Sequence, residues 1–238
     1  MRIIPVIDLK QRLVVRGIGG RRDKYRRIVS RLVASAQPAD IAKSFVEQLG
    51  LRTVYVADLD AIAGAEPDWQ SYAQIAAAGM TLWVDAGAGD VERAAKVADC
   101  PHVDSVIVGL ESLIDIDALQ HIIARLSSAR VIFSLDLKQG EPLTRIANWR
   151  TRAPLDIARQ AAALGAARMI VLDLAAVGTG EGPSTLQLAR DIRQALPQLE
   201  LIGGGGVRHQ DDLDRLAEVG YDAALIASAL HAGVRFRA

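Results

Sequence analysis

The chain has 238 residues, 50% of them hydrophobic, and its 28 basic residues balance its 28 acidic ones. A chain with no net charge is not typical of proteins that coat nucleic acid, and no apolar run approaches the roughly 18–20 residues of a membrane-spanning helix. The one cysteine, Cys100, excludes an intramolecular disulfide and a cysteine-based zinc site.

Short apolar runs alternate with helical stretches along the whole chain. Eight runs have the near-continuous apolar character of parallel strands buried on both faces: Ile3–Ile7, Val54–Ala57, Thr81–Val84, Ser105–Val108, Val131–Leu135, Met169–Leu172, Glu200–Ile202 and Ala223–Ile226. Helical spacing follows six of them: Pro38–Gln48, Asp90–Ala98, Ile116–Leu126, Pro154–Leu164, Ser184–Leu196 and His209–Val219. Eight strands in this length, without a linker, predict one (β/α)8 TIM barrel domain over residues 1–238 rather than a doubly wound open sheet.

The two halves of the sequence repeat one another. The heptapeptide IPVIDLK, which ends at Lys10, returns as IFSLDLK, which ends at Lys138, and the repeat aligns Asp8 with Asp136. In a barrel of this kind the carboxyl ends of the strands build the active site. Two aspartates at such ends are candidates for acid–base chemistry, although they could instead be capping groups. The two lysines could bind an anion, tune the pKa of the aspartates or be solvated loop residues.

Further segments repeat in the same order. Asp58 aligns with Asp173 at the end of the next strand in each half, and we expect both to bind loop amides. The glycine-rich segments after the third and seventh strands also agree. The sequence therefore predicts two similar half-barrels, about residues 1–126 and 127–238. Paired glycine-rich turns suit phosphate groups, because their backbone N–H groups point at an anion.

Several of these motifs resemble the HisA/HisF family of histidine biosynthesis. They are IPVIDLK, VADLDA, VLDLAAVGTGEG and GGGGV, and the resemblance runs from Ile3 to about Gly233. It implies a (β/α)8 barrel that binds a substrate with a phosphate at each end. It also implies catalytic roles for Asp8 and Asp136. The HisA member is an isomerase that converts an aminoaldose to an aminoketose, and the HisF member receives ammonia from a glutaminase partner.

The internal repeat and the resemblance together give the expected substrate- and phosphate-binding positions. Most of them are glycines of strand-end turns, and the set is Lys10, Lys138, Gly178, Thr179, Gly204, Gly205, Gly206, Ser228, Gly87 and Gly109. A tryptophan of HisA has a counterpart in Trp149, for which stacking on a substrate ring and plain packing are both open.

The chain departs from the family pattern at the active face. Where HisA has the acid of an Asp-Gly-Thr motif, this chain has Val177, which cannot transfer a proton. Asp85, Asp90 and Glu111 stand near the first phosphate site, where they would repel phosphate unless they are paired with a cation. We therefore expect one intact phosphate site, after the seventh and eighth strands, and an altered first site.

These observations predict a divergent HisA/HisF-related enzyme with isomerase- or lyase-like proton transfer on a phosphorylated, sugar-linked metabolite. Asp8 would be the base and Asp136 the acid or orienting partner. One alternative is a genuine HisA isomerase that uses a substitute acid such as Glu181 or a lysine. Another is a non-catalytic barrel that binds a ligand or a protein partner.

The remaining features bear on partners and location. We interpret the basic loop over residues 19–27, which begins with two glycines, as a lid over an anionic substrate. Four histidines without metal-ligand spacing lead us to expect no metal, and nothing indicates a cofactor. We expect a phosphorylated small molecule as ligand, no nucleic acid and no membrane, and we leave a homo-oligomer open. The lack of a signal peptide pattern predicts a cytoplasmic protein.

Overall fold

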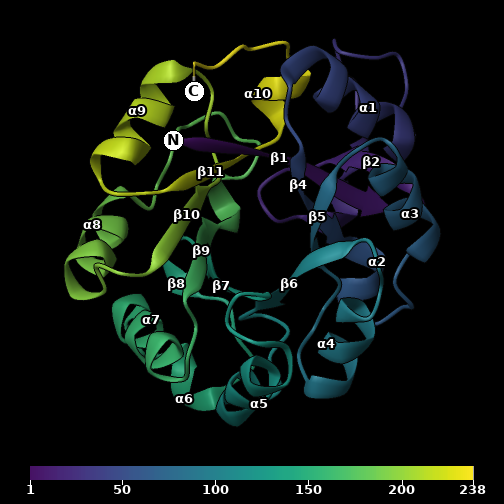
Figure 1. The fold of residues 1–238 in the computed structure, drawn as a ribbon. Helices are drawn as coiled ribbons and strands as arrows, with labels where there is room; N and C mark the ends of the chain where they lie inside the picture. The colour runs from purple at the N-terminus through teal and green to yellow at the C-terminus, as the bar shows by residue number, and fades with distance from the viewer. Residues whose placement is uncertain (238) are drawn as a thin grey trace.

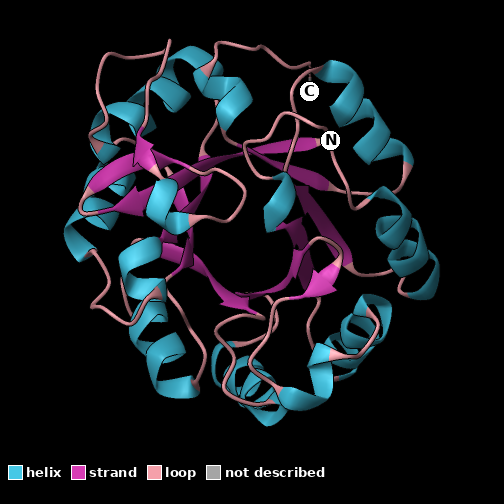
Figure 2. Cartoon of the chain, turned by 180° about the vertical axis from the view of Figure 1, so that it is seen from behind, coloured by secondary structure: helices cyan, strands magenta, loops and turns pink. Residues whose placement is uncertain are grey.

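Eight parallel strands close into one barrel in the computed structural model, which describes residues 1–237 (Figures 1 and 2). The barrel strands are β1 (Arg2–Lys10), β4 (Thr53–Asp58), β5 (Thr81–Asp85), β6 (Val103–Gly109), β7 (Val131–Lys138), β9 (Arg168–Asp173), β10 (Glu200–Gly204) and β11 (Ala223–Ile226). The ring closes because β11 pairs with β1, with Ala223 opposite Arg2. All eight predicted runs lie in these strands, and the predicted (β/α)8 barrel is confirmed.

Longer helices surround the barrel, as Figure 2 shows. They are α1 (Pro38–Leu49), α3 (Trp69–Ala77), α4 (Val91–Ala98), α5 (Ile116–Leu126), α7 (Pro154–Ala163), α8 (Leu186–Ala195) and α9 (Gln210–Glu218). Five short helices lie in loops that follow strands: η1 (Arg22–Lys24), α2 (Leu59–Ile62), α6 (Ala147–Arg150), η2 (Leu174–Ala176) and α10 (Ser228–His231). Among the described residues no helix is long and apolar enough to cross a membrane.

The helix ends follow local signals. Asp90 caps α4 by accepting a hydrogen bond from the backbone N–H of Arg93 at 2.8 Å, which explains the carboxylate at this position. Helix α1 ends at Gly50, whose φ of 69° is a left-handed conformation that glycine adopts without a steric penalty. The carboxylate of Asp90, which the sequence placed near a phosphate site, is therefore the N-terminal cap of a helix.

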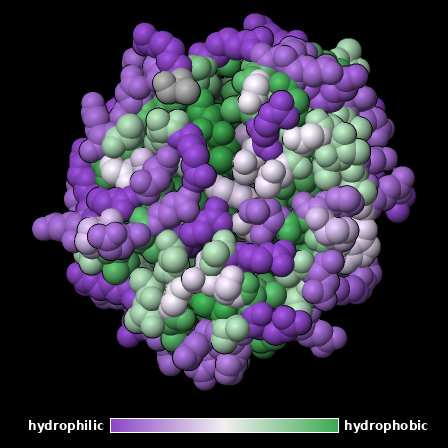
Figure 3. Space-filling view, in the orientation of Figure 1, coloured by the Kyte–Doolittle hydropathy of each residue, from purple (hydrophilic) through white to green (hydrophobic). Residues whose placement is uncertain are grey.

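Alternation along the strands separates two layers of core. Val54 and Val56 of β4 face the helices and belong to the larger cluster, whereas Tyr55 and Ala57 face the barrel interior. The space-filling view shows hydrophilic side chains over most of one face, with hydrophobic ones in smaller patches between them (Figure 3). The alternation of side chains along each strand also decides which polar side chains at the strand ends point into the barrel.

The two halves repeat a local structure. A hairpin joins β1 to β2 (Leu13–Arg16), and a second hairpin joins β7 to β8 (Glu141–Pro142) at the corresponding place. Both turns contain a glutamine with positive φ, 52° at Gln11 and 57° at Gln139. The strand β3 (Arg26–Arg27) extends only the first hairpin. The shared hairpins are what a half-barrel repeat predicts.

Candidate active site

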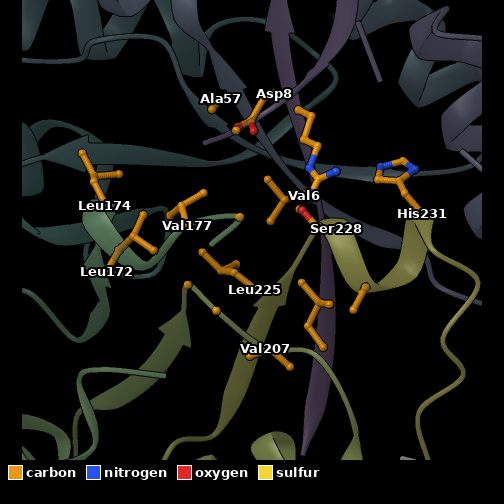
Figure 4. A pocket seen from close by; sticks show the side chains of 18 of the residues that line it. Val6, Asp8, Ala57, Leu172, Leu174, Val177, Val207, Leu225, Ser228 and His231 are labelled. Carbon is orange, nitrogen blue, oxygen red and sulfur yellow. The ribbon is translucent and has the colours of Figure 1, made fainter. Parts of the chain in front are cut away.

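A cavity of about 550 Å³ lies among the loops that follow the barrel strands. Its lining combines charged and apolar side chains, and Figure 4 shows Asp8 and Ser228 among Val6, Val177 and Leu225. The carboxyl ends of the strands and the loops after them form its walls, which is the place where barrel enzymes carry their active sites.

Four carboxylates line one region of this cavity. Asp8 lies near the end of β1, Asp85 ends β5, Asp136 lies near the end of β7, and Glu111 follows β6. The aspartates point inward because each is separated by an even number of residues from an inward-facing residue of its own strand. For example, Asp85 stands two residues after Trp83. Four acids from four neighbouring parts of the ring thus share one space.

Burial makes ionisation of the three aspartates difficult. Burial raises the pKa of Asp8 to about 7, against the opposing charge of Arg22. The pKa of Asp85 also rises to about 7, through burial and the negative charge of Glu111. Burial, again with Glu111, raises the pKa of Asp136 well above its usual value. Near neutral pH the group therefore contains both a proton donor and an available base.

Hydrogen bonds fix two of the acids. The hydroxyl of Ser134 donates to Oδ1 of Asp136 at 2.6 Å. A Cβ at Gly109 would lie 3.0 Å from Oδ2 of the same carboxylate, so a side chain there would press on it. Asp85 accepts hydrogen bonds from the backbone N–H of Gly87 at 3.1 Å and from the Tyr55 hydroxyl at 3.3 Å. Gly87 thus donates to one carboxylate, Gly109 leaves room for another, and neither glycine lines the cavity.

The loop between β1 and α1 covers this acidic region. Arg22 forms an ion pair with Glu111, and Lys10 Nζ donates to the backbone carbonyl of Arg22 at 2.8 Å. Tyr25, from the same loop, is 8% exposed and lines the cavity. The predicted basic loop therefore contributes one arginine to the site, and that arginine is bound to an acid.

Glycine-rich loops and arginines line another region. The loop residues are Gly178, Thr179, Gly180, Gly205, Gly206 and Ser228, and the arginines are Arg16, Arg31 and Arg208. Arg208 is held by Asp212 through Nε–Oδ2 and Nη2–Oδ1 bonds of 2.9 and 3.0 Å, and it also donates to the carbonyl of Gly180. The arginines bring positive charges to this region, although that of Arg208 is paired with Asp212, and the loops bring backbone N–H groups.

Close backbone approach requires glycine at two of these positions. Gly178 has a φ of 69°, and a Cβ there would overlap the carbonyl oxygen of Gly17. Gly206 has a φ of 81°, and a Cβ there would overlap the carbonyl of Gly182. The glycines thus let loops from different strands touch at the cavity.

The structure brings together seven of the residues that the sequence predicted for the site. These are Asp8, Asp136, Gly178, Thr179, Gly205, Gly206 and Ser228. Five others lie outside the cavity lining, namely Lys10, Lys138, Gly87, Gly109 and Gly204. Lys138 is exposed, and Gly204 packs between Leu172 and Leu225. A role in ligand binding stays a prediction for these residues.

Two further expectations have clear outcomes. Asp58 accepts the backbone N–H groups of Ala61 and Asp68, and Asp173 accepts those of Gln139, Gly140 and Ala175. Their predicted role as acceptors for loop amides is confirmed.

Trp149, for which stacking on a ligand was open, is a core residue. It is fully buried, packs edge-on against Phe133 with ring centroids 6.4 Å apart, and donates from Nε1 to Gln160. Packing is therefore the correct interpretation.

The sequence did not single out Tyr25, Tyr55 or Arg22 as site residues. Tyr55 stands in an apolar strand and resembles any core residue, and Arg22 is one of several arginines in a basic loop. Among the described residues, no group of three or more His, Cys, Asp or Glu side chains has an arrangement that could hold a metal ion.

Comparison with known proteins shows the family. The family described as "Histidine biosynthesis protein" matches residues 2–235. An uncharacterised protein of Methanocaldococcus jannaschii is 34% identical over 239 residues, which cover 98% of this chain and 95% of that protein.

Two further relatives have a named activity. They are 1-(5-phosphoribosyl)-5-((5-phosphoribosylamino)methylideneamino)imidazole-4-carboxamide isomerases, from Moorella thermoacetica at 30% identity and Desulfitobacterium hafniense at 29%. Each match covers 98% of this chain, with 94% and 92% of the relative. With the barrel and the paired strand-end aspartates, these matches show that the chain belongs to the histidine biosynthesis protein family, the HisA/HisF family.

Proposed function

We propose that this protein is an enzyme that moves protons on a phosphorylated, sugar-linked metabolite, in an isomerase- or lyase-like reaction. The observation that carries the proposal is the meeting of Asp8 and Asp136 on one cavity, from equivalent positions of the two half-barrels. Both have a raised pKa, which is typical of acid–base residues.

The two aspartates suit different roles. With a pKa of about 7, Asp8 is ionised in part at neutral pH and can accept a proton from carbon. Burial raises the pKa of Asp136 well above its usual value, so this carboxyl group holds its proton more tightly than an exposed one and suits the donor role. The hydrogen bond from Ser134 fixes the orientation of its carboxyl group. This division into base and acid is the one that the sequence suggested.

The glycine-rich region provides an anchor for a phosphate. Gly205, Gly206 and Ser228 offer backbone N–H groups after β10 and β11, and Arg208, held in an ion pair by Asp212, adds a fixed guanidinium group beside them. The acidic region at the ends of β5 and β6 has the opposite charge, because Asp85 and Glu111 line it. This contrast supports one phosphate site where the family has two.

The isomerase reaction of the named relatives is a second candidate, because they match the whole chain. That reaction needs another acid, because Val177 stands where the family has its aspartate. Glu181 is exposed and does not line the cavity, whereas Asp85 and Glu111 do. If this chain runs the isomerase reaction, Asp85 or Glu111 is better placed than Glu181 to supply the proton.

The test is an assay of the purified protein with the aminoaldose substrate of the isomerase relatives, and with Asp8→Ala as the paired variant. Conversion that Asp8→Ala abolishes identifies the isomerase reaction. Without conversion, a screen of phosphorylated metabolites for a rise in melting temperature finds the ligand. Turnover of that ligand with unchanged kcat in Asp8→Ala would refute the role of Asp8, and binding without any turnover would favour a non-catalytic barrel.

A further inference from the structure

Tyr25 carries a buried hydroxyl group whose proton has no acceptor in the protein. Only 8% of the residue is exposed, and it lines the cavity. The hydroxyl oxygen accepts a hydrogen bond from the backbone N–H of Ile18, but within residues 1–237 the hydroxyl donates to no side chain. The hydroxyl groups of the other three tyrosines are each bonded to a side chain, those of Asp85, Asp58 and Thr185. A buried O–H without an acceptor indicates that an oxygen of a ligand takes this hydrogen bond.

The free O–H stands beside the proposed base. The backbone N–H of Gly17 donates to the Asp8 carboxylate, and that of the next residue, Ile18, donates to the Tyr25 oxygen. Neighbouring amides of one loop thus hold both side chains. A Cβ placed at Gly17 would lie 3.1 Å from Oδ2 of Asp8 and 3.5 Å from the Tyr25 oxygen. The carboxylate and the hydroxyl therefore border the same point of the cavity.

Apolar side chains enclose this point. The same Cβ at Gly17 would lie 3.0 Å from Cγ1 of Val177, and Val6 and Leu172 also line the cavity, as Figure 4 shows. These side chains donate no hydrogen bond, so a ligand oxygen that arrives here has the Tyr25 hydroxyl as its donor. Such a hydrogen bond is stronger in apolar surroundings than in water.

Removal of a proton from carbon requires a donor of this kind. The carbon is acidic enough only when a neighbouring carbonyl group takes up the negative charge, and a fixed O–H stabilises that charge as it forms. Burial, together with the negative charge of Asp8, raises the pKa of Tyr25 to about 12. The hydroxyl therefore keeps its proton at neutral pH, as an oxyanion site requires.

We propose that Tyr25 is a further catalytic residue, which donates a hydrogen bond to a carbonyl oxygen of the substrate while Asp8 removes a proton from the adjacent carbon. The inference rests on the proposed function, in which Asp8 is the base. It narrows the substrate to a phosphorylated compound with a carbonyl group next to the reacting carbon.

The step balances without an oxidant or another reactant. The C–H bond breaks, its proton passes to Asp8, and its electron pair forms a C=C bond with the carbonyl carbon. The π pair of the carbonyl group moves to the oxygen that Tyr25 holds. In an isomerisation, Asp8 returns the proton to the former carbonyl carbon, while the proton of a hydroxyl group on the deprotonated carbon moves to the first oxygen.

Two ligands separate the carbonyl end of the site from the phosphate end. Phosphoglycolohydroxamate is a phosphate monoester whose hydroxamate group mimics an enediolate, and inorganic phosphate has no such group. Both are titrated by calorimetry into the full chain and into Tyr25→Phe. We expect the variant to bind the hydroxamate roughly ten- to a hundredfold more weakly, because a hydrogen bond to a charged oxygen is lost. Its affinity for inorganic phosphate should not change.

Tyr221→Phe is the matched control. It also removes a buried hydroxyl, one that is bonded to Thr185 at 2.8 Å and lies outside the cavity lining. It should bind both ligands as the wild type does, and a melting temperature for each variant verifies that it is folded. With ¹³Cζ-labelled tyrosine, the NMR signal that Tyr25→Phe removes should shift when the hydroxamate binds and stay in place with inorganic phosphate.

The contrary results are distinct. Equal affinity of the wild type and Tyr25→Phe for the hydroxamate, or an equal loss for both ligands, overturns the role of Tyr25. A wild type that binds the hydroxamate no more tightly than inorganic phosphate overturns it as well. None of these results decides the proposed function, which the turnover of Asp8→Ala tests separately.

Discussion

Arg22 and Glu111 form an ion pair that joins the loop after the first barrel strand to the loop after the fourth. The contact lies beside the acidic region, where both residues line the cavity. The positive charge of Arg22 lowers the pKa of Asp8 and of Asp85, against the effect of burial. Burial therefore dominates the proton affinity of both acids, and one arginine lowers that affinity for two acids from different strands.

Loss of this charge should raise the pKa of Asp8. In Arg22→Gln we expect the pKa to move above the value of about 7, because burial then acts without the opposing cation. Carbon-detected NMR of the aspartate carboxyl groups measures it without a substrate. Arg21→Gln, an exposed neighbour in the same loop, is the control and should leave the titration unchanged. An identical Asp8 titration in both variants would contradict the electrostatic account.

Ionisation of the buried Asp85 should destabilise the folded protein as the pH rises. Its pKa is about 7 when folded and near 3.8 when unfolded, so the folded state binds more protons and stability falls as the pH rises from about 4 to 7. Asp85→Asn removes this loss, and we expect roughly 1–3 kcal/mol of added stability at pH 8. The gain should shrink at pH 5, as measured by urea unfolding at both pH values. A gain that is the same at both would exclude ionisation as the cause.

Gly178→Ala should lower the stability of the folded protein more than Gly180→Ala does. Both Gly178 and Gly180 have positive φ, but only at Gly178 would the new Cβ overlap a backbone atom, the carbonyl oxygen of Gly17. We expect a cost of roughly 2–4 kcal/mol for Gly178→Ala and about 1 kcal/mol for Gly180→Ala. Thermal unfolding of the two variants gives the comparison. Equal costs would mean that the loop moves away without penalty.

His231 should make the protein sensitive to acid. The side chain is 3% exposed, and burial lowers its pKa to about 4, so the unfolded state binds the proton first. Its contribution to stability is present above about pH 6.5 and is lost as the pH falls toward 4, by roughly 2–3 kcal/mol in total. In His231→Asn the stability should fall less between pH 7 and pH 5 than in the wild type.

The control for this prediction is the exposed His121, where substitution by asparagine should not alter the pH dependence. The comparison uses slopes and not absolute stabilities, because His231 also packs against Phe45 and any replacement loses that contact. A slope in His231→Asn that equals the slope of the wild type would assign the acid sensitivity to another group.

The barrel was predictable because its signals are local. A buried parallel strand is an apolar run whichever strands lie beside it. Each of the eight apolar runs in the sequence lies in such a strand. The strand-end aspartates were predictable for a related reason, since Asp8 and Asp136 occupy the same position of a repeated heptapeptide. The lysines of the same repeat lie outside the cavity lining, because each belongs to a hairpin that turns at the next residue.

The electrostatics of the site depended on distant contacts that no local pattern contains. Arg22 and Glu111 are 89 residues apart in the chain, and any of several arginines in that loop had the right charge. The hydrogen bond between Tyr55 and Asp85 depends on how β4 is aligned with β5, in a register that places Ala57 opposite Asp85. A sequence shows which side chains alternate on a strand but does not give the alignment of one strand with the next.

The pairing of β1 with β11 also has a consequence for synthesis of the chain. Arg2 to Pro5 pair with residues 223–226, so the first barrel strand in chain order pairs on that edge with the last barrel strand. Until those residues emerge, the nascent sheet has two open edges, and open edges invite pairing with other chains. The native ring can therefore close only after residues 223–226 have left the ribosome, and a messenger truncated before Ala223 would encode a protein that lacks the strand needed for closure.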